Sequence, residues 1–303
     1  MRPDVTVVVV SYNSSDSLRA CLEPLAGQPG IDVVVVDNAS PDDSLAVVGD
    51  LPVTALQLDR NGGFAYGCNV GWRSSEAPFI LFLNPDARID PRAVRTLVSA
   101  LEHDDSVGAV GPRIVNDDGT LDFSRRRFPR LSSTFGQALF LHRVFPRALW
   151  TDETIRREDG YAVAGEAEWL SGACLMARRT LLERLDGLDE GFFMYCEDKD
   201  LCRRCWDTGA RVWYEPAAVV VHEGGASAPR SSLLPVLAAS KVRYARKHRR
   251  PVLALAERLG LALGELTHVI VSRGGRPSRA GHLAALAVVA GIRRPLLPGA
   301  RAG

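Results

Sequence analysis

The sequence predicts an α/β fold: a mostly parallel sheet flanked by helices, followed by a C-terminal helical appendage. Strand and helix patterns alternate through the first half of the chain at the spacing of βαβ units. The first apolar run, residues 5–10, is an unbroken series of β-branched residues, as expected for a strand buried on both faces of a parallel sheet. After Gly224-Gly225 the composition changes and helical patterns take over. We therefore expect two parts, residues 1–225 and residues 226–303.

Local signals predict each element in order. Ser15 or Asp16 can cap a first helix, and Pro91 is well placed at the start of another. The expected strands lie at residues 5–10, 33–36, 53–58, 79–83, 107–110, 211–214 and 219–221, with regular patterning also at 169–177. The expected helices lie at residues 15–26, 91–101, 180–185, 198–207, 233–247, 252–271 and 281–292. Residues 117–166 lack a clear period, so we expect a mobile or substrate-covering region there.

Composition and charge restrict the class of protein. The chain has 303 residues, of which 46% are apolar and 24% charged, as in an ordinary globular protein. The net charge of +1 hides an asymmetry: residues 226–303 carry 14 Lys or Arg and 2 acids, whereas residues 1–225 carry 23 and 34. The tail is therefore either a basic arm for an anionic partner or a helical region packed on the acidic body.

Targeting and redox signals are weak. We see no signal peptide and no apolar stretch long enough to span a bilayer. The six cysteines are scattered rather than spaced as a framework, which fits a reducing cytosol. Cys202-x-x-Cys205 lies inside a predicted helix without a second matching pair, so redox and zinc-binding interpretations are both disfavoured.

Polar residues follow three of the predicted strands, at Ser11 to Asn13, Asp37 to Ser40 and Asn84 to Asp86. Ligands of open parallel sheets bind at the carboxyl ends of the strands, so one ligand can meet all three segments. Each segment alone also has a structural explanation, since Asp37 can cap a helix and Asn84-Pro85 is a turn signal.

A glycine-rich stretch, Asn61-Gly62-Gly63 through Asn69-x-Gly71, follows the third strand and opens a helix. Glycines let backbone N–H groups approach a ligand, and a helix N-terminus favours a diphosphate nearby. A tight strand-to-helix turn explains the same glycines. A nicotinamide-dependent dehydrogenase would need its glycine fingerprint after the first strand, where this chain has Ser11-Tyr12-Asn13.

The densest group of acids, Glu197-Asp198-Lys199-Asp200, follows the aromatic run Phe192 to Tyr195. Aromatic neighbours can desolvate one carboxylate and raise its pKa, which suits a general base. Acids are also common at helix N-termini for electrostatic reasons. His222 ends a buried strand, where the sites of such sheets cluster, although a single histidine is often structural.

Taken together and in this order, these segments resemble glycosyltransferase family 2, the inverting enzymes of GT-A fold, and within it the bacterial rhamnosyltransferase-like branch. The matching stretches span residues 5 to 225: Val9-Val10-Ser11-Tyr12-Asn13, Val35-Val36-Asp37-Asn38-Ala39-Ser40, Asn61-Gly62-Gly63-Phe64-Ala65, Phe82-Leu83-Asn84-Pro85-Asp86, Trp169-Leu170-Ser171-Gly172-Ala173, Phe192 to Cys202, and His222.

The resemblance implies a role for each matched residue. Asp198 is the expected catalytic base, and Asp86 and His222 are the expected ligands of a divalent cation, Mg²⁺ or Mn²⁺. Asn84 stands where the common DXD triplet has its first Asp, so we assign it to the donor. The residues expected to bind the nucleotide-sugar are Ser11, Tyr12, Asn13, Asp37, Asn61, Gly62, Asn69 and Asn84. Those expected on the acceptor side are Trp169, Gly172 and Glu197.

The implied activity is transfer of a sugar, with rhamnose from dTDP-rhamnose as the best guess, to a hydroxyl of a glycan or lipid-linked acceptor. A single in-line displacement would invert the anomeric centre, with Asp198 taking the proton. One alternative is a non-catalytic nucleotide-sugar binding module, which has no need of Asp198 and His222 together. The other is the dehydrogenase.

The basic tail also has a functional interpretation that is consistent with this resemblance. Six cations precede an apolar-periodic helix, which suits the anionic inner face of a plasma membrane and a cytoplasmic, peripherally bound protein. Helix packing or homo-oligomerisation explains the pattern equally well. A nucleic-acid partner is disfavoured because no recognised motif accompanies the charge. The cations are Lys241, Arg243, Arg246, Lys247, Arg249 and Arg250, and the apolar residues are Leu255, Leu259, Leu266 and Ile270.

Overall fold

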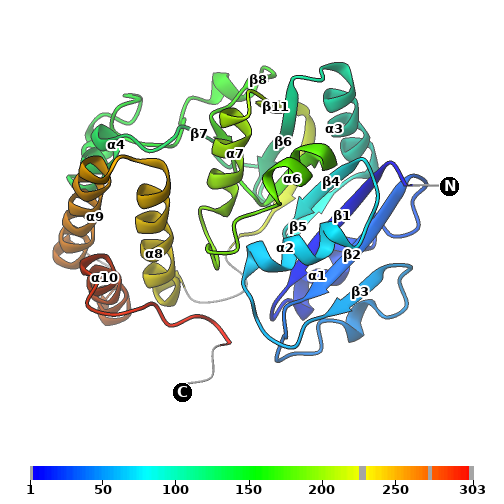
Figure 1. The fold of residues 1–303 in the computed structure, drawn as a ribbon, viewed down its shortest axis with the longest axis horizontal. Helices are drawn as coiled ribbons and strands as arrows, with labels where there is room; N and C mark the ends of the chain where they lie inside the picture. The colour runs from blue at the N-terminus through cyan, green and yellow to red at the C-terminus, as the bar shows by residue number, and fades with distance from the viewer. Residues whose placement is uncertain (1–2, 225–229, 272–274, 300–303) are drawn as a thin grey trace.

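The computed structural model describes residues 3–224, 230–271 and 275–299. A nine-stranded sheet runs through the first part, and the C-terminal helices form a group beside it (Figure 1). The strand order is β3-β2-β1-β4-β10-β6-β11-β5, with β8 added to β11, and β7 and β9 form a separate pair. The strands are β1 (Val5–Ser11), β2 (Ile31–Asp37), β3 (Thr54–Gln57), β4 (Phe79–Leu83), β5 (Ala87–Ile89), β6 (Val107–Val115), β7 (Arg125–Arg126), β8 (Gly165–Glu166), β9 (Trp169–Leu170), β10 (Cys174–Arg178) and β11 (Arg211–His222).

The prediction of a mostly parallel sheet is confirmed. Strands β3, β2, β1 and β4 are parallel neighbours, and β6 is parallel to β11. Strand β10 is antiparallel to both β4 and β6, so the group β3-β2-β1-β4 and the pair β6-β11 run in the same direction. The runs expected at 211–214 and 219–221 form one strand with an irregularity between Glu215 and Val219. The carboxyl ends of β1, β2, β4 and β11 therefore share one edge.

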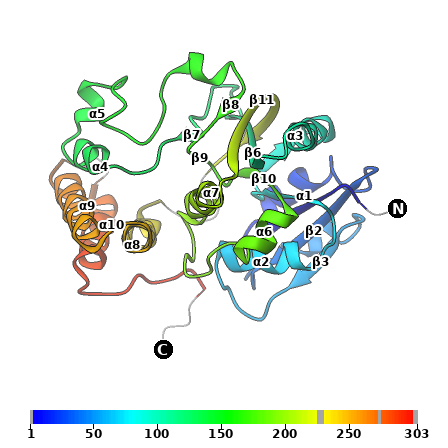
Figure 2. The ribbon, with the colours of Figure 1, turned by 45° about the horizontal axis from the view of Figure 1, so that its top comes forward.

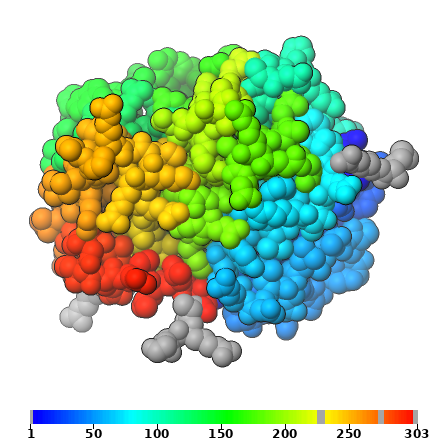
Figure 3. Space-filling view, viewed as in Figure 1, coloured from blue at the N-terminus to red at the C-terminus, as the bar shows by residue number. Residues whose placement is uncertain are grey.

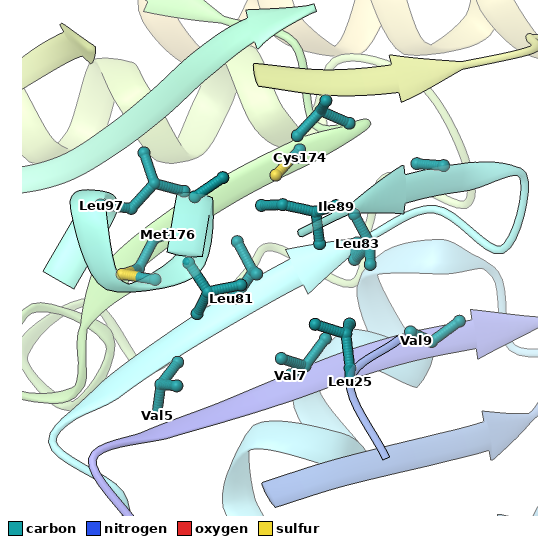
Figure 4. Close-up of a cluster of buried hydrophobic side chains, with 14 of the residues drawn as sticks. Val5, Val7, Val9, Leu25, Leu81, Leu83, Ile89, Leu97, Cys174 and Met176 are labelled. Atoms are coloured by element: carbon teal, nitrogen blue, oxygen red, sulfur yellow. The ribbon is translucent and has the colours of Figure 1, made fainter. Parts of the chain in front are cut away.

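Helices cover both faces of the sheet, and the β-branched run of β1 explains why. Val7 and Val9 belong to a core that includes α1 and α3, as Figure 4 shows for part of it, whereas Val8 and Val10 belong to a core with α2, α6 and α7. Alternating side chains of a strand point to opposite faces, so a continuous apolar run needs cover on both. Each fully buried valine or leucine contributes about 1.5–3 kcal/mol. The α-helices of this part are α1 (Ser15–Leu22), α2 (Phe64–Arg73), α3 (Pro91–His103), α4 (Leu131–Ala138), α5 (Leu141–Val144), α6 (Arg179–Leu185) and α7 (Glu197–Asp207), and the 3₁₀ turns are η1 (Ala46–Val48) and η2 (Glu158–Tyr161).

The C-terminal region consists of α8 (Arg230–His248), α9 (Pro251–Val271) and α10 (Gly275–Ala290), close to the predicted helices. The segment 117–166, expected to be irregular, contains α4 and α5, and α4 packs on α9 (Figure 2). Helix α4 escaped prediction because its packing partner, α9, is distant in sequence, and α5 escaped it because none of its four residues is buried. No helix among the described residues is long and apolar enough to cross a membrane.

Charge pairs fasten α8 to the acidic body. The Asp200 carboxylate, fully buried, lies 2.7 Å from Lys247 Nζ and 2.7 Å from His248 Nε2. Asp189 pairs with Arg243 and Lys247, both at 2.7 Å, and its pKa falls to about 2, because these cations outweigh the opposing effect of burial. Arg249 pairs with Glu257 inside the tail. About half of the basic cluster is thus engaged in packing, as the second interpretation of the charge asymmetry predicted.

The six cysteines are all free and buried. Burial raises the pKa of Cys205 to about 12 and raises that of Cys202 well above its usual value. Thiols of this kind are inert, so Cys202 and Cys205 serve as core residues.

Candidate active site

A cavity of about 550 Å³ opens at the edge of the sheet where the parallel strands end. Tyr12 and Asn61 line one end of it, Asp86 and His222 lie at its base, and Asp198 comes from the first turn of α7. These residues are distant in sequence, and the common direction of β1, β2, β4 and β11 brings them together. The convergence expected from strand-end polar residues is therefore present in the structure.

Asp86 and His222 are neighbours because of one strand pairing. Asp86 directly precedes β5, whose residue Ala87 pairs with His222 at the end of β11. Asp86 Oδ1 lies 3.2 Å from His222 Nε2, and Asn84 Nδ2 lies 3.3 Å from the same nitrogen. Burial by itself raises the pKa of Asp86, but the hydrogen bond and charge of His222 bring that pKa below its ordinary value. Burial by itself lowers the pKa of His222, and Asp86 raises it above its ordinary value.

This pair has the donor chemistry for a divalent cation that is shared with a phosphate. Within the parts of the chain that the structure describes, no group of three or more His, Cys, Asp or Glu side chains is arranged to hold a metal ion. Mg²⁺ sites commonly use one or two carboxylates and fill the remaining positions with water and substrate phosphate. One carboxylate and one imidazole, both facing the cavity, fit such a partial set.

The loop after β3 is held by a residue that the sequence interpretation did not single out. Asn38, directly after β2 and 2% exposed, accepts a hydrogen bond from the Gly62 N–H at 2.9 Å and donates to the Gly63 carbonyl at 3.0 Å. Gly63 has φ +91°, and a Cβ there would lie 2.3 Å from the Phe193 carbonyl oxygen. This glycine therefore permits the loop to approach the segment that carries the acidic cluster.

The other residues expected at the donor divide into two groups. Tyr12, Asn61 and Asn84 line the cavity. Ser11 and Asp37 are buried, and neither contributes to the cavity wall. One Asp37 oxygen accepts from the Ser40 N–H at 3.1 Å, whereas the other and the Ser11 hydroxyl have no hydrogen-bond partner within the described residues.

Asn13 and Asn69 lie away from the cavity wall. The Asn13 N–H donates to Ser40 Oγ at 3.1 Å, and its side chain is exposed. Asn69 is buried and fully engaged: its amide donates to Leu188 and Glu190 and accepts from Trp72 and Leu188. The geometry makes Asn69 a brace between α2 and the loop before α7 rather than a contact to the donor.

Asp198 is held in place by backbone donors. Its Oδ2 accepts from the Gly172 N–H at 2.8 Å and its Oδ1 from the Lys199 N–H at 2.7 Å. A Cβ on Gly172 would lie 3.0 Å from Asp198 Cβ, so the loop before β10 packs directly on this side chain. Tyr195 and Cys196 both have positive φ, +70° and +66°, in the turn that starts α7. Such backbone is uncommon outside glycine and occurs often at functional sites.

Glu197 is the desolvated carboxylate of the cluster. It is 6% exposed, and its Oε2 has no hydrogen-bond partner in the described part of the chain. Burial first, and the neighbouring charge of Asp198 second, raise the pKa of Glu197 well above its usual range. The desolvated carboxylate expected in this cluster is therefore Glu197, which lines the same cavity as Asp198.

Other parts of the cavity wall come from segments that the sequence analysis did not link to one another. Trp169, expected on the acceptor side, donates its indole N–H to the Arg127 carbonyl at 2.9 Å. Lys199 is 5% exposed, pairs with Glu153 at 2.7 Å and lies 4.8 Å from the Trp169 ring centre. Glu153 belongs to the irregular segment, and only the folded chain reveals that it faces α7.

The fold places the chain among GT-A glycosyltransferases. Over 99% of this chain and 78% of the other, it aligns with the mannosyltransferase PcManGT from Pyrobaculum calidifontis, solved with GDP-Man and Mn²⁺, at a TM-score of 0.55 and 21% identity. It aligns with S. aureus TarS residues 1–349 over 95% of this chain and 81% of that one, at a TM-score of 0.55 and 16% identity. The GT-A expectation is confirmed.

The chain belongs to glycosyl transferase family 2. The sequence model of that family matches residues 6–185. The chain is 31% identical to the N-acetylglucosaminyl-diphospho-decaprenol L-rhamnosyltransferase of Mycobacterium tuberculosis, over 78% of this chain and 82% of that protein. It is 27% identical to the rhamnosyltransferase WbbL of Escherichia coli, over 72% and 83%. Family membership excludes the dehydrogenase.

Proposed function

We propose that the protein transfers a sugar from a nucleoside diphosphate sugar to a hydroxyl of a lipid-linked glycan, with inversion at the anomeric carbon. The observation that carries this proposal is that Asp86, His222 and Asp198 line a single cavity at the carboxyl edge of the sheet. The cation-binding pair can stabilise a departing diphosphate, and the separate carboxylate in the same cavity can accept a proton from an entering alcohol. A nucleotide-binding module needs only the first of these.

The donor that we propose is dTDP-rhamnose, and the proposed acceptor is a sugar linked through diphosphate to a lipid. Support comes from relatives named as rhamnosyltransferases, the first of which carries an N-acetylglucosaminyl-diphospho-decaprenol acceptor in its name. In this proposal Tyr12 and Asn61 contact the nucleotide, and Asn84 contacts the diphosphate or sugar. Ser11 and Asp37, which are buried and do not line the cavity, support the residues that contact the nucleotide.

The chemistry assigns one step to each side chain. Asp198, oriented by the Gly172 and Lys199 N–H groups, accepts the proton of the acceptor hydroxyl as its oxygen attacks the anomeric carbon. Asp86 and His222 would hold a divalent cation, Mg²⁺ or Mn²⁺, which when bound offsets the charge of the diphosphate. Burial raises the pKa of Glu197 well above its usual range and so favours its protonated form, and we therefore assign the acceptor proton to Asp198, in a single displacement that needs no carboxylate nucleophile.

A donor panel tests the proposed function. Purified protein is incubated with Mg²⁺ or Mn²⁺ and dTDP-rhamnose, UDP-GlcNAc or GDP-mannose, with and without a GlcNAc-diphospho-prenol acceptor. We expect metal-dependent thermal stabilisation by one donor, slow hydrolysis of that donor alone, and faster transfer when acceptor is present. Donor binding with neither hydrolysis nor transfer would instead support the binding-module alternative.

We further propose that one end of the molecule contacts an anionic membrane at the cytoplasmic face. Helix α9 exposes a stripe of apolar side chains at helical spacing, and the loop after α5 exposes Phe145 and Trp150 on the same end (Figure 2). The C-terminal helices cover that end in the space-filling view (Figure 3). Arg143, Arg147, Arg246 and Arg250 are also exposed. The exposed stripe consists of Val252, Leu255, Leu259, Leu266 and Ile270.

Apolar insertion combined with nearby cations is the pattern of a peripheral membrane surface. We therefore expect the double variant L255D/L259D to lose sedimentation with vesicles containing anionic lipid, while Val219→Asp, at an exposed position on β11, retains it. Unchanged binding of the double variant would contradict the membrane contact. A wild-type protein that self-associates through α9 and ignores vesicles would show that the stripe is an oligomer interface.

A further inference from the structure

Two cations in the catalytic cavity have no carboxylate to neutralise them. His222 faces Asp86, and Lys199 is paired with Glu153. Arg126 and Lys241 also line the cavity, and within residues 3–224, 230–271 and 275–299 neither forms an ion pair. The Arg126 Nε is buried and without a hydrogen-bond partner there. Both side chains are half-buried, and a cation that is partly removed from water without a counterion favours an anionic ligand.

Arg126 and Lys241 belong to segments that are distant in sequence from the loops expected to bind the donor. Arg126 is in β7, and its guanidinium lies 5.2 Å from the ring centre of Trp169 in β9. Lys241 comes from α8, one residue after Ser240, whose hydroxyl donates to the Met194 carbonyl at 2.8 Å. Both cations therefore line the cavity from elements outside the nine-stranded sheet.

A second cavity adjoins the catalytic cavity. It has a volume of about 590 Å³ and lies among α4, α8, α9 and α10. Its boundary with the catalytic cavity is shared, since Gln137, Glu153, Thr154, Lys199, Leu237 and Lys241 line both. Lys241 stands at this junction, so a ligand that extends from Asp198 into the second cavity passes its ammonium group.

We propose that Arg126 and Lys241 bind the phosphate or diphosphate of the acceptor. This rests on the proposed function, in which a glycan acceptor hydroxyl reaches Asp198. A guanidinium recognises phosphate oxygens in a bidentate manner, and lysine adds a point charge. In this proposal the donor diphosphate binds at Asp86 and His222, and the acceptor phosphate binds at Arg126 and Lys241.

The test compares a charged and a neutral acceptor. The variants are Arg126→Gln, Lys241→Gln and the charge-preserving Lys241→Arg, with Arg95→Gln as the control because Arg95 is an exposed cation of α3 that lines neither cavity. Each protein is assayed with GlcNAc-diphospho-prenol and with an uncharged alkyl GlcNAc glycoside. Donor hydrolysis without acceptor is measured in parallel.

We expect each Gln variant to lower kcat/KM for the diphosphate acceptor by about 10-fold or more, mainly through KM, since a hydrogen bond to a charged group is worth about 1.5–3 kcal/mol. Turnover of the neutral glycoside, donor hydrolysis and thermal stability should stay within about 2-fold or a few degrees of wild type. Lys241→Arg should restore most of the loss, and the control should match wild type.

Equal losses with both acceptors would overturn the proposal, and so would a raised KM for the donor, because the cations would then serve the nucleotide-sugar. Binding of GlcNAc-diphospho-prenol without donor, followed by calorimetry, separates this inference from the proposed function. Weaker binding by the Gln variants supports the site even if no donor is turned over. Unchanged binding contradicts it even if transfer is observed.

Discussion

The two sides of the catalytic cavity are built in different ways. The donor side comes from strand ends of one sheet, whose positions follow from the β-branched runs and their common direction. The acceptor side comes from the segment 117–166 and from α8, which are brought together by side-chain charge pairs and by packing of α4 on α9. A regular scaffold positions the groups that a nucleotide-sugar needs in general. In the proposed function, the irregular half holds the groups that bind the acceptor.

The largest effect is expected on the donor side. Asp86→Ala removes the carboxylate of the proposed cation pair and should reduce transfer below detection, as should a chelator added to wild type. Asp105→Ala, at a fully exposed position before β6, serves as the control and should transfer normally. Transfer that survives both the Asp86 substitution and chelation would show that this side works without a cation.

The next largest effect is expected on stability and concerns the charge pairs that fasten α8 to the body of the protein. Asp200→Asn leaves Arg204, Lys247 and His248 around a neutral side chain, and removing one partner of a buried ion pair costs about 3–5 kcal/mol. We expect a loss of stability of that size in urea unfolding. Asp207→Asn breaks only the exposed pair with Arg203 on the same helix and should cost less than about 1 kcal/mol. Similar losses for both variants would mean that charge does not fasten α8 to the body.

The donor side could be predicted from sequence because its signals are local. The apolar runs at residues 79–83 and 219–221 predict buried strands, so Asp86 and His222, which follow them, are expected at the same edge of a parallel sheet. Their direct contact also depends on the antiparallel pairing of β5 with β11, and β5 was not predicted. The roles of Asn69 and Asn38 could not be separated in this way. Asn69 lies within the glycine-rich stretch and Asn38 directly follows β2, and only burial and hydrogen bonding show that Asn69 braces a helix whereas Asn38 holds the loop at the cavity.

The acceptor side could not be predicted because its contacts are long-range. Lys199 pairs with Glu153 across 46 positions of sequence, and nothing near Glu153 marks it as part of a site. Lys241 was predicted as one member of a basic cluster for a membrane. The structure divides that cluster into residues that bind Asp189 and Asp200, residues that remain exposed, and Lys241, which faces the cavity.

The smallest effect distinguishes the two acids at the start of α7. The native state keeps a proton on Glu197 that the unfolded chain releases above pH ~4.5, so stability should fall as pH rises, by at most about 1.4 kcal/mol per unit. Glu197→Gln should remove this slope between pH 5 and 8 in thermal unfolding, leaving the variant relatively more stable at pH 8. Glu183→Gln, at an exposed position on α6, should keep the wild-type slope. A Glu197→Gln profile parallel to wild type would show that Glu197 is ionised in the folded protein.

The most direct test of the central claim is the Asp198→Asn variant, with donor binding and sugar transfer measured on the same preparation. Asn keeps the shape of the side chain and can still accept from Gly172, but it cannot take a proton. We predict a decrease in kcat of about 10²–10⁴-fold, with donor affinity within about 2-fold of wild type. Near-full turnover would contradict the assignment of Asp198 as the base, and loss of donor binding would place it on the donor side.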